Sequence, residues 1–183
     1  ARNAAVELAD GELIAFCDSD DSWYPDRLER QLAAFADTPD AGMVHGHIAV
    51  TDEKGRLLPD RTAETCEILS AAHDGGATYA SYAIENRCFS STILVRREVF
   101  DTVGMYDSTL PIEDYDFYLR LLLAYDIRFL EGAPLARYRA HLDKTQNDAL
   151  GAGHILAADN HLEMSDVRDD IAPDRPSRQN FRL

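Results

Sequence analysis

A group of carboxylates directly after an apolar run is the clearest chemical signal in this sequence. Asp18, Asp20 and Asp21 follow the apolar segment 13–17. Apolar residues at this density are typical of a buried strand, and open α/β sheets bind ligands beyond the carboxyl ends of their strands. At such a place Mg2+ or Mn2+ binds through one or two carboxylates together with the phosphate oxygens of a substrate. The group therefore predicts a site for a phosphorylated ligand that carries a divalent metal ion.

Two other interpretations of this acidic group remain open. Asp and Ser are favoured in turns and at helix N-termini, so the group also fits a turn before the helix expected after residue 25. A calcium loop of the EF-hand type would begin at Asp18 and end at Glu29. That loop needs Gly where this sequence has Trp23, and the segment before it favours a strand over a helix, so it is the weakest of the three.

A second acidic group, Glu113 and Asp114, stands at the head of an expected amphipathic helix. Carboxylates stabilise a helix N-terminus whatever the protein does, which is the structural interpretation. A carboxylate within hydrogen-bond reach of a hydroxyl can also act as a general base, which is the catalytic interpretation. The sequence leaves both open.

His141 follows an expected strand at 135–139. A single His is often a surface or capping residue, but a neutral imidazole is also a good ligand for Mn2+. We interpret His45 and His47 as structural because no acidic residue stands near them in the sequence. Arg96 and Arg97 are more simply the exposed start of a helix than a phosphate site.

Helices and strands alternate along the chain and must position these residues. The expected helices cover 1–9, 25–37, 97–103 and 111–123, and the expected strands cover 12–17, 43–50, 91–95, 127–130 and 135–139. In the second helix, Leu28, Leu32 and Phe35 recur at the spacing of one buried face. The segment 56–76 has no clear period and is expected to be a loop or a short helix. Gly104 stands where a left-handed helix cap is expected.

Length and composition fit one globular domain, because 183 residues with 45% hydrophobic content can bury a sizeable core. The formal net charge of −15 argues against nucleic acid as a partner, since nucleic-acid binding needs clustered Lys and Arg. The three cysteines lack the close spacing of a redox or zinc motif, which suggests a reducing compartment. The composition is compatible with a homo-oligomer.

No apolar stretch is long enough to span a bilayer, and the start of the chain has no signal-peptide pattern. We therefore expect a soluble chain that reaches a membrane only through segments outside this sequence. The chain begins at Ala1, without Met and already in a helical pattern, so we expect a further segment upstream.

The motifs occur in a characteristic order. They lie at 1–3, 9–12, 16–21 with Trp23 and Pro25, 91–97, 103–107, 113–116 with 119–121, and 134–135 with 138–139 and His141. Each motif alone is weak, but the ordered series resembles the family 2 glycosyltransferases of the GT-A fold. The resemblance covers residues 1–142.

The resemblance implies an α/β, Rossmann-like domain with a mixed sheet flanked by helices, from which the N-terminal strands are missing. Residues 143–183 would form a helical extension and a loose tail. The implied reaction is the inverting transfer of a sugar from a nucleotide-sugar donor to the hydroxyl of a glycan, lipid-linked or small-molecule acceptor. It would require Mn2+ or Mg2+ and would take place in the cytoplasm or at the inner face of the membrane, in bacterial polysaccharide biosynthesis.

Carried over by position, the family's donor-site roles fall on four residues. Asp20 would bind the metal, and Asp18 would bind the ribose or complete the metal shell. His141 would bind the metal or the diphosphate. Arg2 would lie near the nucleotide.

The family's acceptor-site roles fall on the second acidic group. Asp114 would be the general base, with Glu113 beside it at the acceptor edge. The metal would offset the charge of the leaving diphosphate while the base deprotonates the acceptor, so the reaction needs no covalent enzyme intermediate.

Two alternatives belong to other classes. The haloacid dehalogenase-like phosphatases also place Asp-x-Asp at a strand end, as in Asp18 and Asp20, but need a downstream Lys, and neither Lys54 nor Lys144 stands in a convincing setting. The non-enzyme alternative is a catalytically inactive glycosyltransferase-like domain that binds a nucleotide sugar or a partner.

Overall fold

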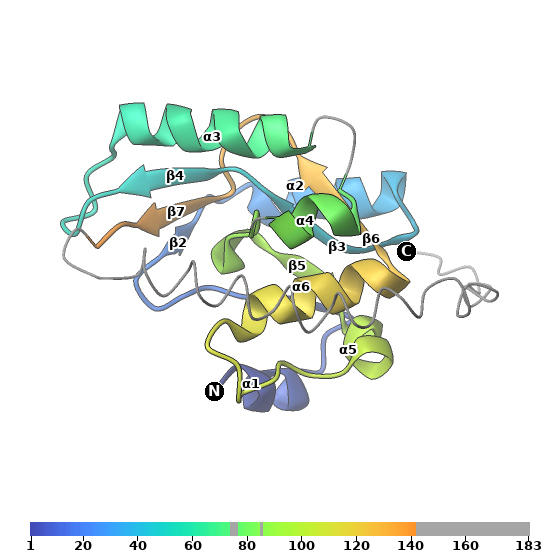
Figure 1. The fold of residues 1–183 in the computed structure, drawn as a ribbon. Helices are drawn as coiled ribbons and strands as arrows, with labels where there is room; N and C mark the ends of the chain where they lie inside the picture. The colour runs from blue at the N-terminus through green and yellow to red at the C-terminus, as the bar shows by residue number, and fades with distance from the viewer. Residues whose placement is uncertain (74–76, 85, 142–183) are drawn as a thin grey trace.

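The computed structural model describes residues 1–73, 77–84 and 86–141 of the chain (Figure 1). In chain order its elements are α1 (Arg2–Leu8), β1 (Leu13–Ala15), β2 (Ser22–Trp23), α2 (Arg27–Asp37), β3 (Ala41–Gly46), β4 (Ile48–Thr51), α3 (Pro59–His73), α4 (Tyr79–Ile84), the 3-10 turn η1 (Ser90–Thr92), β5 (Leu94–Arg96), α5 (Arg97–Val103), α6 (Glu113–Ala124), β6 (Asp126–Leu130) and β7 (Ala136–Arg139). The expected extension over 143–183 lies outside the described residues.

The strands form two mixed sheets. The larger has the order β1-β5-β3-β6, in which β5 runs antiparallel to both of its neighbours and β3 pairs parallel with β6. The smaller has the order β2-β7-β4, with β2 antiparallel and β4 parallel to β7. Figure 1 shows α3 over β4 and α6 over the larger sheet. The predicted mixed sheet with flanking helices is confirmed.

Alternate residues of the larger sheet enter two separate cores. Met43 and Val95 pack with α4, α5 and α6, whereas Val44 and Leu94 pack under α2. This is the alternation expected of a sheet that is covered on both faces. The α6 core is rich in aromatic residues, among them Phe117, and burying each large apolar side chain contributes about 1.5–3 kcal/mol.

The segment 43–50 is two strands, and the single strand predicted there is wrong. The chain leaves the larger sheet after Gly46 and enters the smaller one at Ile48. Every residue of both strands is buried, so burial does not change where the first strand ends. The sequence pattern therefore gives no sign of the break. At Gly46 a Cβ would stand 2.8 Å from the Leu130 carbonyl oxygen, and this close approach of two backbones explains the glycine.

Helix α3 replaces the loop or short helix predicted within 56–76. It has 15 residues but no clean apolar stripe, since Leu69 is buried while its neighbour Ile68 is 53% exposed. Polar contacts fix it to β4, including a 2.9 Å hydrogen bond from the Val50 amide to the Thr62 hydroxyl. A helix held in this way carries little periodic signal.

The buried face of α2 differs from the predicted one. Leu28 and Leu32 are more than 40% exposed, and the buried residues are Arg27, Gln31, Ala34 and Phe35. Only Phe35 of the predicted face is therefore confirmed. A hydrophobicity pattern misses this face because two of its members are polar side chains with partners inside the protein.

The remaining predictions need smaller corrections. The strand predicted at 91–95 begins as the turn η1 and becomes β5 only at Leu94. The helices predicted at 1–9, 97–103 and 111–123 are confirmed as α1, α5 and α6. Gly104 has a φ of +82°, the positive sign that favours glycine, but its ψ of 176° lies outside the left-handed helical region, so the left-handed cap predicted there is wrong. Within the described residues, no helix combines the length and apolarity that a bilayer span requires.

Candidate active site

The first acidic group lies in a turn directly after β1. The Asp21 amide donates to the Asp18 carbonyl oxygen at 3.0 Å, which closes the turn. Two neighbours hold it in place: the Asp18 amide donates to the Ser91 hydroxyl at 3.0 Å, and the Arg139 amide donates to Asp21 Oδ1 at 2.9 Å. The group therefore stands beyond the carboxyl end of β1, as predicted. A strand precedes it, so the EF-hand interpretation is excluded.

Asp20 and His141 meet at the surface although 121 positions separate them. His141 Nε2 lies 2.7 Å from Asp20 Oδ2, and the two side chains are 33% and 42% exposed. The hydrogen bond from His141 lowers the pKa of the Asp20 carboxyl. A ligand can therefore reach an ionised carboxylate with an imidazole beside it.

The chemistry of this pair fits a metal ion that is shared with a ligand. Within the described residues, no group of three or more His, Cys, Asp or Glu side chains is arranged to hold an ion. Asp20 and His141 supply one carboxylate and one imidazole, with Asp18 in the same turn. Mg2+ commonly binds through one or two protein ligands with waters and substrate phosphates completing its shell.

The second acidic group opens α6, where three carboxylates in the first turn favour the helix N-terminus. Asp114 Oδ2 accepts a 3.0 Å hydrogen bond from the Ser90 hydroxyl, and its Oδ1 accepts one of 2.8 Å from the Tyr115 amide. Burial raises the pKa of Asp114, while Arg2 and Ser90 oppose that rise. A shielded carboxylate with a raised pKa is a suitable general base.

Arg2 joins the two acidic groups. Its Nη1 lies 2.9 Å from Glu113 Oε1 and 3.7 Å from Asp114 Oδ2, and its Nη2 lies 3.4 Å from Asp18 Oδ1. Burial acts to lower the pKa of Arg2, but the surrounding carboxylates, Asp114 foremost, raise it. The structure thus brings the six predicted site residues into two sets of contacts: Arg2 with Asp18, Glu113 and Asp114, and Asp20 with His141.

Asn3 positions Arg2. Its side-chain amide donates to the Tyr106 carbonyl oxygen at 2.8 Å and accepts from the Tyr106 amide at 3.1 Å. This two-point contact fixes α1 to the loop that precedes α6. Asp116, the third acid of the α6 motif, faces inward and pairs with Arg120 at 2.8 Å, so its role is structural.

Sequence analysis did not identify Ser90 as a site residue and treated Ser91 only as part of a motif. Both hydroxyls contact acidic groups of the site. The available signal was the run Ser90–Thr92, three consecutive hydroxyl residues at the start of an otherwise apolar strand pattern.

His45 and His47 lie away from this site. His45 is fully buried and its Nε2 lies 2.7 Å from the Tyr82 hydroxyl, as its structural interpretation implies. Glu131 lies 3.7 Å from His47, so an acidic residue stands nearby in space although none does in sequence. Lys54, which the phosphatase alternative would need, is exposed in the turn after β4, and Lys144 lies outside the described residues.

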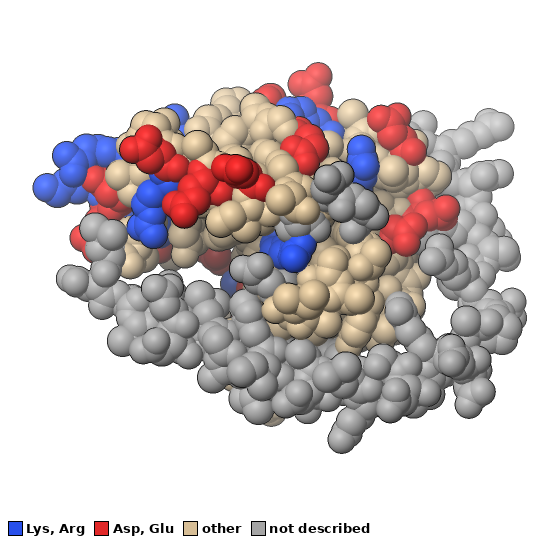
Figure 2. Space-filling model, turned by 45° about the horizontal axis from the view of Figure 1, so that its top comes forward, with Lys and Arg blue, Asp and Glu red and all other residues tan. Residues whose placement is uncertain are grey.

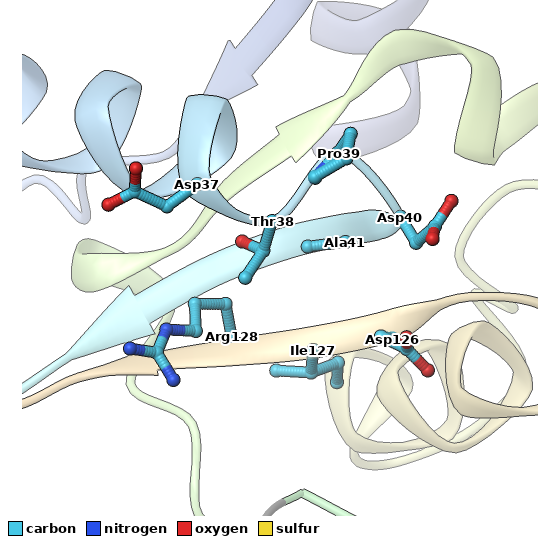
Figure 3. A pocket seen from close by; sticks show the side chains of 8 residues that line it. All are labelled: Asp37, Thr38, Pro39, Asp40, Ala41, Asp126, Ile127 and Arg128. Carbon is cyan, nitrogen blue, oxygen red and sulfur yellow. The ribbon is translucent and has the colours of Figure 1, made fainter.

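A hollow of about 290 Å³ lies at the opposite end of the larger sheet (Figure 3). Residues 37–41, which follow α2 and enter β3, and residues 126–128 of β6 line it. It contains none of the predicted site residues. The candidate active site is therefore the surface between the two acidic groups.

Comparison with known proteins identifies the family of the chain. The family model described as glycosyltransferase like family 2 matches residues 1–149. The chain belongs to glycosyltransferase family 2.

Among curated relatives of this glycosyltransferase, the uncharacterized glycosyltransferase MJ1057 of Methanocaldococcus jannaschii is 25% identical over 129 residues, covering 70% of this chain and 42% of the relative. The uncharacterized glycosyltransferase YwdF of Bacillus subtilis is 27% identical over 154 residues, covering 83% and 54%. The chain thus spans about half the length of these relatives.

Solved structures confirm the GT-A fold of the glycosyltransferase. S. aureus TarS 1-349 in complex with UDP-GlcNAc has a TM-score of 0.55 at 20% identity, covering 80% of this chain and 40% of that one. The mannosyltransferase PcManGT from Pyrobaculum calidifontis, in complex with GDP-Man and Mn2+, has a TM-score of 0.59 at 17% identity, covering 86% and 42%.

Proposed function

We propose that this glycosyltransferase transfers a sugar from a nucleotide-sugar donor to an acceptor hydroxyl with inversion, and that it uses Mn2+ or Mg2+. The observation that carries the proposal is the division of the site into an exposed carboxylate with an imidazole and a shielded carboxylate with a raised pKa. The first suits a metal-bound diphosphate, and the second suits proton removal.

On the donor side, Asp20 and His141 would hold the metal ion at the diphosphate of the donor. Asp18 would bind the ribose or complete the metal shell. A bound divalent ion supplies Lewis-acid stabilisation of the charge on the leaving nucleoside diphosphate. Support for this donor class comes from TarS and the mannosyltransferase, which were solved with UDP-GlcNAc and with GDP-Man and Mn2+.

On the acceptor side, Asp114 accepts the proton of the acceptor hydroxyl as its oxygen attacks the anomeric carbon. The bond between that carbon and the phosphate oxygen breaks, and its electron pair leaves with the nucleoside diphosphate. Glu113, partly exposed beside Asp114, binds the acceptor. A single displacement of this kind inverts the anomeric configuration, and the acceptor is a glycan, a lipid-linked sugar or a small molecule.

A turnover experiment tests this proposal. The chain is incubated with Mn2+, α-linked UDP-, GDP- or dTDP-sugars and a panel of acceptors, and the anomeric protons are followed by NMR. We expect a β-linked product that Asp114→Asn abolishes. An α-linked product, or turnover that Asp114→Asn leaves intact, contradicts the proposal. Metal-dependent donor binding without turnover supports the inactive binding domain instead.

A further inference from the structure

The turn η1 contacts both acidic groups, and its adjacent hydroxyls contact one group each. The Ser90 hydroxyl donates to Asp114 Oδ2 at 3.0 Å. The Ser91 hydroxyl accepts from the Asp18 amide at 3.0 Å. Two neighbouring side chains thus contact the base side and the donor side of one site.

Buried polar side chains of α2 hold this turn from beneath. Gln31 Nε2 donates to the Thr92 carbonyl oxygen at 2.8 Å, and Arg27 Nη2 donates to the Ile93 carbonyl oxygen at 2.7 Å. Arg27 and Gln31 are both fully buried, and a 2.8 Å hydrogen bond joins them. The backbone that follows Ser90 is therefore held in place, which gives the Ser90 hydroxyl a defined position.

Ser90 completes the set of contacts around the Asp114 carboxylate. Asp114 Oδ1 is occupied by the Tyr115 amide, while Oδ2 receives the Ser90 hydroxyl. The Ser90 oxygen in turn accepts from Arg2 Nη2 at 3.3 Å, so the hydroxyl is oriented with its hydrogen toward Asp114. Arg2 Nη1 itself remains 3.7 Å from Asp114 Oδ2. The Ser90 hydroxyl is thus closer to that oxygen than the Arg2 guanidinium is.

We propose that Ser90 is a positioning residue for the general base: its hydroxyl fixes the orientation of the Asp114 carboxylate for proton transfer. This inference rests on the proposed function, in which Asp114 is the base. A charge-assisted hydrogen bond from a hydroxyl to a carboxylate is among the stronger hydrogen bonds, and small errors in the orientation of a reacting group cost large factors in rate. Ser91 instead positions the turn that contains Asp18, on the donor side of the site, because its hydroxyl accepts from the Asp18 amide.

The test compares Ser90→Ala and the near-isosteric Ser90→Cys with Ser90→Thr, which keeps the hydroxyl. We expect the first two to lower kcat about 10- to 100-fold and to leave the affinity for donor nucleotide within about twofold. The acidic limb of the kcat/KM profile should move to higher pH, because Asp114 loses a donor that favours its charged form. Ser90→Thr should recover most of the activity, and the exposed Ser108→Ala is the matched control.

Ser91→Ala should behave oppositely, raising the dissociation constant for donor nucleotide without moving the acidic limb. The inference is overturned if Ser90→Ala retains kcat within about twofold of the wild-type value, or if Ser90→Thr is as impaired as Ser90→Ala. It is also overturned if donor affinity falls as far as kcat does. Thermal unfolding identifies variants that fail to fold, for which Ser90→Cys takes the place of Ser90→Ala.

A second readout separates failure of this inference from failure of the proposed function. If the wild-type chain shows no turnover, the proposed function fails, and the Asp114 carboxyl is titrated by 13C NMR in the same variants. An upward shift of its pKa in Ser90→Ala, absent in Ser90→Thr, supports the positioning contact. An unchanged pKa in Ser90→Ala overturns it.

Discussion

Asp114, the proposed general base, illustrates how a residue suited to catalysis can oppose folding. Its carboxylate is largely shielded from water, and burial raises its pKa although Arg2 and Ser90 stabilise the charge. A raised pKa in the folded state means that the folded chain binds more protons than the unfolded chain above the ordinary Asp pKa. Stability therefore falls as the pH rises through the pKa of folded Asp114.

Replacing Asp114 by Asn should separate the contribution of its carboxylate to turnover from its effect on stability. We expect Asp114→Asn to lower turnover about 100- to 10,000-fold, since it removes the proposed general base. The same variant should have a higher free energy of unfolding than the wild-type chain at pH 7, and this advantage should shrink toward low pH, where Asp114 is protonated. Urea unfolding at several pH values measures the difference. A variant less stable than wild type at pH 7 would show that the contacts of Asp114 outweigh the cost of its burial.

His141 should determine how firmly a metal is held. We expect His141→Ala to weaken Mn2+-dependent nucleotide binding about 10-fold or more, because an imidazole ligand and the partner of Asp20 are both lost. Binding measured without metal should not change, which is the internal control. Equal losses with and without Mn2+ would assign His141 to the nucleotide itself. Titration calorimetry measures both.

The pH dependence of metal binding follows from Asp20. Its hydrogen bond to His141 lowers its pKa in the folded state. The folded chain therefore binds fewer protons on Asp20 than the unfolded chain, and this contribution to stability is present above the ordinary Asp pKa and is lost as the pH falls through the lowered value. In His141→Ala, metal-dependent binding should consequently be lost at a higher pH than in wild type. An identical acid limit in both proteins would contradict this coupling.

At the scale of elements, the sequence predicted those helices and strands whose apolar residues recur with a clear period. Helix α6, with its wide apolar stripe, and helix α5 with Gly104 at its end were found at the expected positions. Helix α3 was not, because side-chain hydrogen bonds to β4 rather than an apolar stripe attach it. The break between β3 and β4 was also missed, since full burial on both sides leaves no change of pattern.

The buried polar pair of α2 provides a test at this scale. Gln31→Leu leaves the carbonyl oxygens of Val44 and Thr92 without their donor, and should lower the free energy of unfolding by about 2–4 kcal/mol. Leu32→Gln is the matched control on the same helix, because Leu32 is 43% exposed, and it should change stability by less than about 0.5 kcal/mol. Urea unfolding of the two variants shows which face of α2 is buried. A larger loss of unfolding free energy for Leu32→Gln than for Gln31→Leu would support the buried face predicted from periodicity.

At the scale of the whole molecule, the order of motifs was the informative signal. Each motif admits a structural explanation, yet their succession predicted both the GT-A fold and the residues that meet at the site. The supporting contacts of Ser90, Ser91 and Asn3 were not predictable, because these residues carry no charge and no periodicity. Contacts of this kind depend on the three-dimensional path of the chain.

The distribution of charge on the molecule favours binding of an anionic ligand at one local site over binding along a broad basic surface. On the face shown in Figure 2, acidic and basic side chains of the described residues are interspersed among uncharged ones. With a net charge of −15, general electrostatic attraction does not favour a phosphorylated donor. The proposed function therefore requires a metal ion at Asp20 and His141 to compensate the charge of the donor.

That requirement makes nucleotide binding the most direct test. The chain is titrated calorimetrically with UDP, GDP and dTDP, each with and without Mn2+, and the series is repeated with Asp20→Ala. We expect one nucleotide to bind more tightly when Mn2+ is present, and Asp20→Ala to abolish this metal-dependent gain in affinity. A folded chain that binds the nucleotide equally well without metal, or equally well after Asp20→Ala, or that binds none of the three, would contradict it.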